Sequence, residues 1–118
     1  MHGVVEIQAL PPDEVRRALS AGTSVLIDVR EPNEYSAERI DGALLFPLST
    51  FDPAALPDTA GRPIILHCGS GKRSAAALER CQRAGFAVTR HLGGGIAAWK
   101  ASGLPVVRAG GDPPKRSV

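Results

Sequence analysis

The sequence has 118 residues, of which 43% are hydrophobic and 22% charged, which suits one domain with a buried core and is too short for two. Its net charge is +2 and no basic run is interleaved with aromatic residues, so we expect no binding to nucleic acid. No apolar stretch approaches the roughly 18 residues of a membrane span and the N-terminus has no signal-peptide pattern, so we expect no membrane contact and a cytoplasmic location.

The first part of the chain predicts a strand, a helix and further strands. Residues 4–8 (VVEIQ) alternate apolar and polar side chains as a strand does, and the segment PPDEVRRALSAG then shows helical spacing between two prolines and Gly22. The apolar run SVLIDV at 24–29 is too short for a buried helix and suits a parallel strand covered on both faces. Residues 43–46 (ALLF) are a weaker strand candidate.

The middle of the chain repeats this alternation. The run PIILHC at 63–68 predicts a second buried strand. Residues 73–84 predict a helix that ends at Gly85, with an apolar face formed by Ala77, Leu78, Cys81 and Ala84.

The last part predicts a short strand at 88–92 (VTRHL) and a short helix at 96–101. We expect the domain to cover residues 1–107, because the segment 108–118 (RAGGDPPKRSV) is too polar and too rich in Gly and Pro to pack and reads as a disordered tail. Strands that alternate with helices predict a single α/β domain with a central, mainly parallel sheet flanked by helices.

Cys68 lies where a predicted parallel strand meets the next helix, and ligands bind at such junctions in open α/β sheets. The following loop contains Gly69 and Gly71, which let successive backbone N–H groups turn toward the sulfur, and the helix N-terminus adds partial positive charge. Lys72 and Arg73 add full charges. Because all of these features favour a thiolate, Cys68 is the candidate nucleophile. A cysteine that only packs in the core would not require the glycines and the cations.

Three segments, in order, resemble the single-domain rhodaneses, which are cytosolic sulfurtransferases. The segment VLIDVREPNEYSAERIDGALLFPLS resembles their first signature, HCGSGKRS their active-site loop and HLGGGIAAWKASGLPV their C-terminal signature, so the resemblance covers about residues 5–107. It implies a rhodanese-like three-layer sandwich in which Cys68 becomes a persulfide. The residues that cradle the outer sulfur would be Gly69, Ser70, Gly71, Lys72 and Arg73.

The activity that this resemblance implies is transfer of a sulfane sulfur. The donor would be thiosulfate or a persulfide, and the acceptor cyanide or a thiol, either small or on a sulfur-accepting protein. Many relatives have Arg directly after the cysteine, whereas this chain has Gly69, so one cation that would bind an anionic donor is missing. Arg39 and Leu45 also stand where the family often has His and Asn.

Two other functions remain open. Cysteine-dependent phosphatases and arsenate reductases use a similar loop, but their arginine follows the cysteine by six positions and Arg73 follows Cys68 by five. Rhodanese-like domains that act as non-catalytic interaction modules commonly lack the cysteine, which this chain keeps. We therefore favour the sulfurtransferase.

Several residues near the predicted site are expected to have structural roles. Asp28 and Arg30 end a buried strand, where an ion pair or loop-bracing hydrogen bonds are more plausible than acid–base chemistry. His67 is next to Cys68, but neighbours on a strand point to opposite faces, which favours packing. His91 precedes three glycines and could border the pocket.

The remaining candidates are expected to be inert. Trp99 should fill the core under the last helix, and Cys81 should be a buried free thiol rather than a disulfide or resolving partner. No cluster has metal-ligand spacing, and the glycine run at 93–95 lacks the rest of a dinucleotide fingerprint. We expect neither a metal nor another cofactor.

Overall fold

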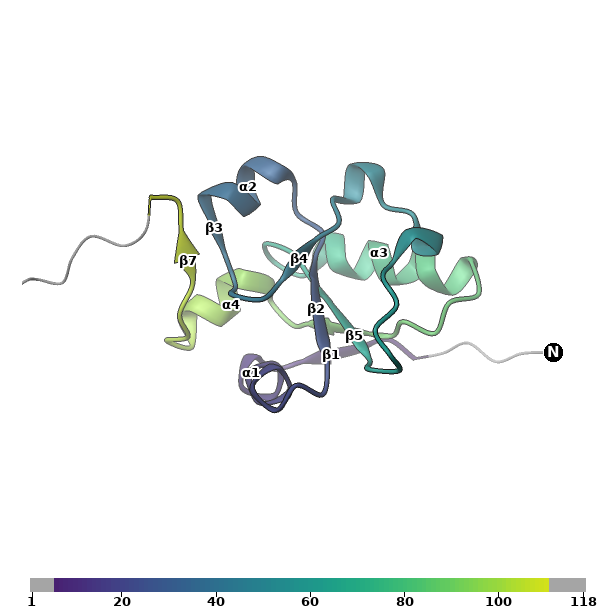
Figure 1. The fold of residues 1–118 in the computed structure, drawn as a ribbon, viewed down its shortest axis with the longest axis horizontal. Coiled ribbons are helices and arrows are strands. Elements are labelled where there is room, and N and C mark those ends of the chain that lie inside the picture. Colours follow the sequence, from purple (N-terminus) through teal and green to yellow (C-terminus); the bar gives the residue numbers. More distant parts are fainter. Residues whose placement is uncertain (1–5, 111–118) are drawn as a thin grey trace, which may run out of the picture.

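Five parallel strands form the centre of the structure, a computed structural model that describes residues 6–110. Figure 1 shows the strands between layers of helices. The strands lie in the order β1 (Gln8–Leu10), β6 (Arg90–Leu92), β5 (Ile64–His67), β2 (Val25–Asp28) and β4 (Leu44–Leu45). Because all five are parallel, their carboxyl ends share one edge of the sheet.

The two central strands are the two apolar runs that the sequence predicted. Asp28 at the end of β2 is in register with His67 at the end of β5. Side chains alternate along each strand, so Leu26 packs in one hydrophobic cluster and its neighbour Ile27 in the other. Both faces of the sheet are therefore buried, which explains why these segments are continuously hydrophobic.

Helices cover both faces, giving the expected three-layer sandwich (Figure 1). Val15 of α1 (Pro12–Ala21) and Trp99 of α4 (Gly95–Ala101) pack in the first cluster. Leu78 of α3 (Lys72–Arg83) packs in the second cluster, which also receives Leu48 of the short 3-10 turn η1 (Leu48–Thr50); a second such turn, η2 (Pro53–Ala55), follows. No helix within residues 6–110 is long and apolar enough to cross a membrane.

Besides the two 3-10 turns, one helix and two strands have no counterpart in the sequence prediction. The helix α2 (Pro32–Ala37) begins with a capping box between Glu31 and Glu34. The strands β3 (Glu38–Arg39) and β7 (Val107–Arg108) pair antiparallel as a separate two-stranded sheet.

Several boundaries differ from the prediction, and so does one residue of the buried face of α3. The strand β6, for example, begins at Arg90 rather than at residue 88. The first strand occupies Gln8–Leu10 rather than residues 4–8, of which 4 and 5 lie outside the described residues. Arg108, the first residue of the segment expected not to pack, pairs in β7, and residues 111–118 lie outside the described part of the chain. On α3 the buried stripe includes Ser74 in place of Ala84, which is exposed.

Candidate active site

Cys68 directly follows β5 and begins the loop that leads into α3, as predicted. Its sulfur accepts hydrogen bonds from the N–H of Gly71 at 3.0 Å and the N–H of Ser74 at 3.3 Å. Gly71 has φ +104°, a conformation that L side chains rarely adopt, and this turn directs its N–H toward the sulfur. The loop is therefore an N–H nest around a sulfur atom.

The nest changes the acidity of the thiol. Burial raises the pKa of Cys68, but hydrogen bonds from the Ser74 side chain and from the backbone N–H groups of Ser74, Gly71 and Ser70 lower it by more. The net pKa is below the ordinary value of a cysteine. These groups are placed where they stabilise a thiolate, the reactive form of the side chain.

The N-terminus of α4 holds the other side of the loop backbone. The N–H of Ile96 donates to the Cys68 carbonyl at 2.8 Å, and that of Ala97 donates to the Gly69 carbonyl at 3.1 Å. Gly95 allows this approach, because a Cβ there would lie 2.4 Å from the Cys68 carbonyl oxygen. The glycine run is thus a packing device: α4 binds the loop carbonyls, while loop N–H groups face the sulfur.

Of the two cations expected beside the sulfur, Arg73 is already paired. Its guanidinium donates to both carboxylate oxygens of Glu34 on α2, at 2.7 and 2.9 Å. The same arginine lies over the loop, since a Cβ at Gly69 would be 3.1 Å from its Nη2. Lys72 is exposed, and no hydrogen bond or ion pair engages it among residues 6–110. The uncompensated positive charge of the loop is therefore that of Lys72.

Asp28 and Arg30 form the expected ion pair behind the site. Arg30 donates from Nε to both oxygens of Asp28, and from Nη2 at 2.9 Å. The same Nη2 donates to the carbonyl of Glu38 at 2.6 Å, which ties the end of β2 to β3.

His67 packs against this pair and is fully buried. Its Nε2 lies 3.4 Å from Asp28 Oδ2 without hydrogen-bond geometry, and its Nδ1 is 3.3 Å from the Cys68 carbonyl oxygen. Burial lowers the pKa of His67 in spite of the nearby carboxylate, so the ring is neutral near pH 7. As predicted, His67 has a packing role.

Ser74 and His91 complete the surroundings of the sulfur. The sequence indicated that His91 could border the pocket, but it assigned no role to Ser74. The Ser74 hydroxyl is 3.6 Å from the Cys68 sulfur and 2.7 Å from Nδ1 of His91 on β6. Ser74 is three and four residues before Ala77 and Leu78, a spacing that places it on the buried stripe of α3. That spacing was the available signal, because a polar group on a buried face needs partners.

The residues expected to be inert are buried. Burial raises the pKa of Cys81 to about 11, and both cysteines are free thiols. Trp99 is in the core and donates from its indole N–H to the Pro105 carbonyl at 2.8 Å. Within residues 6–110 no group of three or more His, Cys, Asp or Glu side chains could hold a metal ion.

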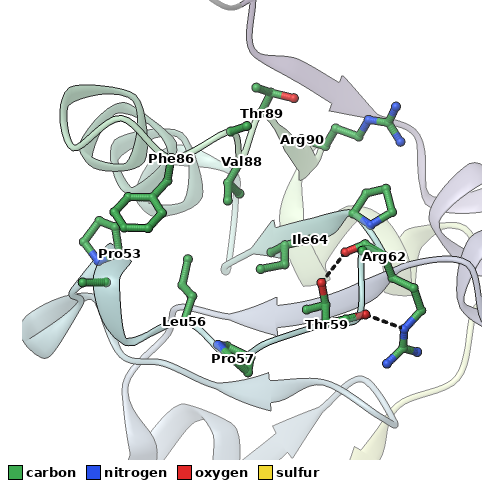
Figure 2. Close-up of a pocket in the computed structure, with 14 residues that line it drawn as sticks. Pro53, Leu56, Pro57, Thr59, Arg62, Ile64, Phe86, Val88, Thr89 and Arg90 are labelled. Carbon is green, nitrogen blue, oxygen red and sulfur yellow. Dashed lines mark hydrogen bonds between the residues drawn. The ribbon is translucent and has the colours of Figure 1, made fainter.

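A pocket of about 540 Å³ lies away from this site, at the opposite end of β5 (Figure 2). Phe86 and Val88 lie on one side of the pocket, and Leu56 and Ile64 border it from below. The strand β5 separates Ile64 from Cys68 by roughly 13 Å at 3.3 Å per residue. This pocket therefore has no part in the chemistry of the loop.

Comparison with known protein families matches residues 11–102 to the rhodanese-like domain. The chain belongs to the rhodanese-like family. It is 43% identical over 95 residues to a probable adenylyltransferase/sulfurtransferase, MoeZ, of Mycobacterium tuberculosis, with 76% of this chain and 24% of that protein aligned. It is 32% identical over 83 residues to a sulfurtransferase of Allochromatium vinosum, covering 70% of this chain and 78% of that one.

Solved rhodanese-like structures have the same architecture. The rhodanese-related protein of Thermoplasma volcanium superposes with a TM-score of 0.72 at 26% identity, covering 85% of this chain and 97% of the other. This chain spans 58% and 24% of the length of the first two curated relatives. The family and the fold are thereby shown, and two of the relatives named here carry the word sulfurtransferase in their names.

Proposed function

We propose that this rhodanese-like domain moves a sulfane sulfur from thiosulfate or a persulfide to a thiophilic acceptor through a persulfide on Cys68. The observation that carries the proposal is the nest, in which Gly71 and Ser74 donate to the Cys68 sulfur and lower its pKa. Because the thiolate is formed before the donor arrives, the displacement itself needs no general base. We place this activity in the cytoplasm.

The reaction has two displacements. The Cys68 thiolate attacks the outer sulfur of the donor, a bond forms between the two sulfurs, and the donor S–S bond breaks. From thiosulfate, sulfite leaves with the electron pair. The acceptor, cyanide or a thiol, then attacks the outer sulfur of the persulfide and regenerates the thiolate. No electrons enter or leave overall, and ping-pong kinetics should result.

The loop can serve both states of the sulfur. The N–H groups of Ser70, Gly71 and Ser74 face the thiolate, and in the persulfide state they would face the charge on the outer sulfur. Ser70 and Lys72 are exposed at the mouth of the loop, where a donor would arrive.

The pairing of Arg73 argues against phosphatase chemistry. Phosphate recognition uses both branches of an arginine fork for two phosphate oxygens. Here Glu34 occupies both branches, at 2.7 and 2.9 Å. We expect no more than trace hydrolysis of an aryl phosphate.

The decisive experiment is a mass spectrum after incubation with thiosulfate or an aromatic thiosulfonate. We expect one added sulfur, about 32 Da, on the peptide that contains Cys68, because the thiolate is the nucleophile. The protein with Cys68→Ser should remain folded but carry no sulfur and transfer none to cyanide. Sulfur on the Cys81 peptide, or an unmodified protein with efficient aryl phosphate turnover, would overturn the proposal.

A further inference from the structure

Two side chains extend the hydrogen bonds of the Cys68 sulfur away from the loop. The Ser74 hydroxyl lies between the sulfur, at 3.6 Å, and Nδ1 of His91, at 2.7 Å. Ser74 is completely buried, whereas His91 keeps 8% of its exposure. Polar groups thus connect the buried Cys68 thiol, through the buried Ser74 hydroxyl, to the His91 imidazole, which has some access to water.

The direction of the Ser74 hydroxyl depends on the state of its neighbours, because a hydroxyl has one proton to donate. When Cys68 is a thiol, its S–H can donate to Ser74, whose O–H then donates to an unprotonated Nδ1 of His91. When Cys68 is a thiolate, the best arrangement is reversed: Nδ1–H donates to Ser74, and Ser74 donates to the sulfur. The Gly71 carbonyl, 3.2 Å from Ser74 Oγ, is a competing acceptor, but a charged sulfur attracts the donor more strongly.

We propose that His91 is a positioning residue for the Cys68 nucleophile, and that it turns the Ser74 hydroxyl from acceptor of the thiol proton to donor toward the thiolate. In this step the thiol proton passes to Ser74 Oγ while the proton of Ser74 passes to Nδ1 of His91. The imidazolium releases its Nε2 proton to water. One proton leaves overall, and a thiolate and a neutral Nδ1–H imidazole remain.

The surroundings of His91 suit this role. Ala9 of β1 and Leu66 of β5 flank it in the sheet, and Gly71 approaches its ring at the loop. These neighbours carry no charge, and Cys68 is the titratable group that the hydrogen bonds reach. Burial lowers the pKa of His91, so the ring is neutral near pH 7. A neutral imidazole can carry its proton on either nitrogen, as this role requires.

This inference deepens the proposed function, whose nucleophile is Cys68, but it can be tested without a sulfur donor. The probe is iodoacetamide, which is neutral and reacts with the thiolate, and the measurement is the alkylation rate as a function of pH. A Cys81→Ala background leaves Cys68 as the single cysteine. We expect His91→Phe to raise the pKa of Cys68 by about 1, and so to slow alkylation roughly tenfold below that pKa.

A double-mutant cycle separates positioning from packing. If His91 acts through Ser74, then His91→Phe should cause little further change in a protein that already carries Ser74→Ala. His91→Asn, which retains a hydrogen-bonding group, should recover most of the wild-type pKa. His91→Leu replaces the Phe variant if circular dichroism shows that the latter does not fold.

Two results would overturn the inference. One is a pKa of Cys68 that stays at the wild-type value in the folded Phe or Leu variant. The other is a pair of shifts, from His91 and Ser74, that simply add in the double variant. A loss of sulfur transfer with normal alkylation would instead count against the proposed function alone.

Discussion

Glu34→Gln tests the ion pair that fixes the active-site loop to α2. The substitution keeps the size of the side chain but removes the charge that Arg73 pairs with. Hydrogen bonds from Arg73 are the largest cause that lowers the pKa of Glu34, from an ordinary 4.5 to about 2. For a fully buried pair that difference corresponds to roughly 3 kcal/mol of folding free energy.

Exposure reduces this figure. The Glu34 and Arg73 side chains are 33% and 36% exposed, so water screens much of the interaction and we expect a loss of about 1 kcal/mol at pH 7. The pKa of Glu34 is lower in the folded state, so its contribution is complete above about pH 4.5 and is lost as the pH falls toward 2. The difference between wild type and variant should therefore shrink below pH 4.5.

Urea unfolding at pH 7, 5 and 3.5 measures this difference. Glu79→Gln is the matched control, because Glu79 is exposed on α3 and has no partner among the described residues. A loss at pH 7 no larger than that of the control, or one that does not change between pH 7 and 3.5, would refute the argument. The variant should also lower the KM for thiosulfate several-fold, since it leaves the charge of Arg73 free to attract an anion.

Three further predictions concern the loop and its supports. Gly95→Ala should lower the free energy of unfolding by about 3 kcal/mol and raise the pKa of Cys68, because the new Cβ meets loop backbone at 2.4 Å. Urea unfolding measures the loss. The control is Gly103→Ala, which has φ +79° but open space around it and should cost about 1 kcal/mol. Cys81→Ala should reduce sulfur transfer no more than a few-fold while costing about 1 to 2 kcal/mol, and a folded but inactive variant would contradict its structural role. Lys72→Ala should raise the KM for thiosulfate more than it lowers kcat, and the effect should weaken as salt screens the charge; an equal fall in kcat and kcat/KM would mean that Lys72 acts in the transition state.

The sequence predicted those parts of the fold whose signals are local. The runs at 24–29 and 63–68 are hydrophobic because both faces of their strands are covered, and this can be recognised without the structure. The helix α2 has no buried residue and hence no apolar periodicity; its start is marked by the capping box, which the sequence analysis did not use. β3 and β7 are two residues each and form through a long-range pairing that no local pattern specifies.

The candidate site likewise has one part that the sequence predicted and another that it did not. Cys68 and its loop could be predicted because a strand, glycines and a helix start are adjacent in the sequence. Glu34 contacts Arg73 across 39 residues, and His91 contacts Ser74 across 17. The order of the strands in the sheet brings these partners together, and no local pattern in the sequence indicates that order.

The cap that α4 places on the loop carbonyls has a consequence for how the site comes into being. A nascent chain that has not yet emerged past Ala97 contains the whole Cys68 loop, but the carbonyls of Cys68 and Gly69 lack their donors. The groups that lower the pKa of Cys68 lie in the loop and the first turn of α3, but α4 holds the loop backbone that positions them. If α4 opens by local unfolding, the carbonyls of Cys68 and Gly69 lose these donors while the sheet stays paired. The reactivity of Cys68 should then fall before the whole domain unfolds, so that its loss reports the detachment of α4 from the loop.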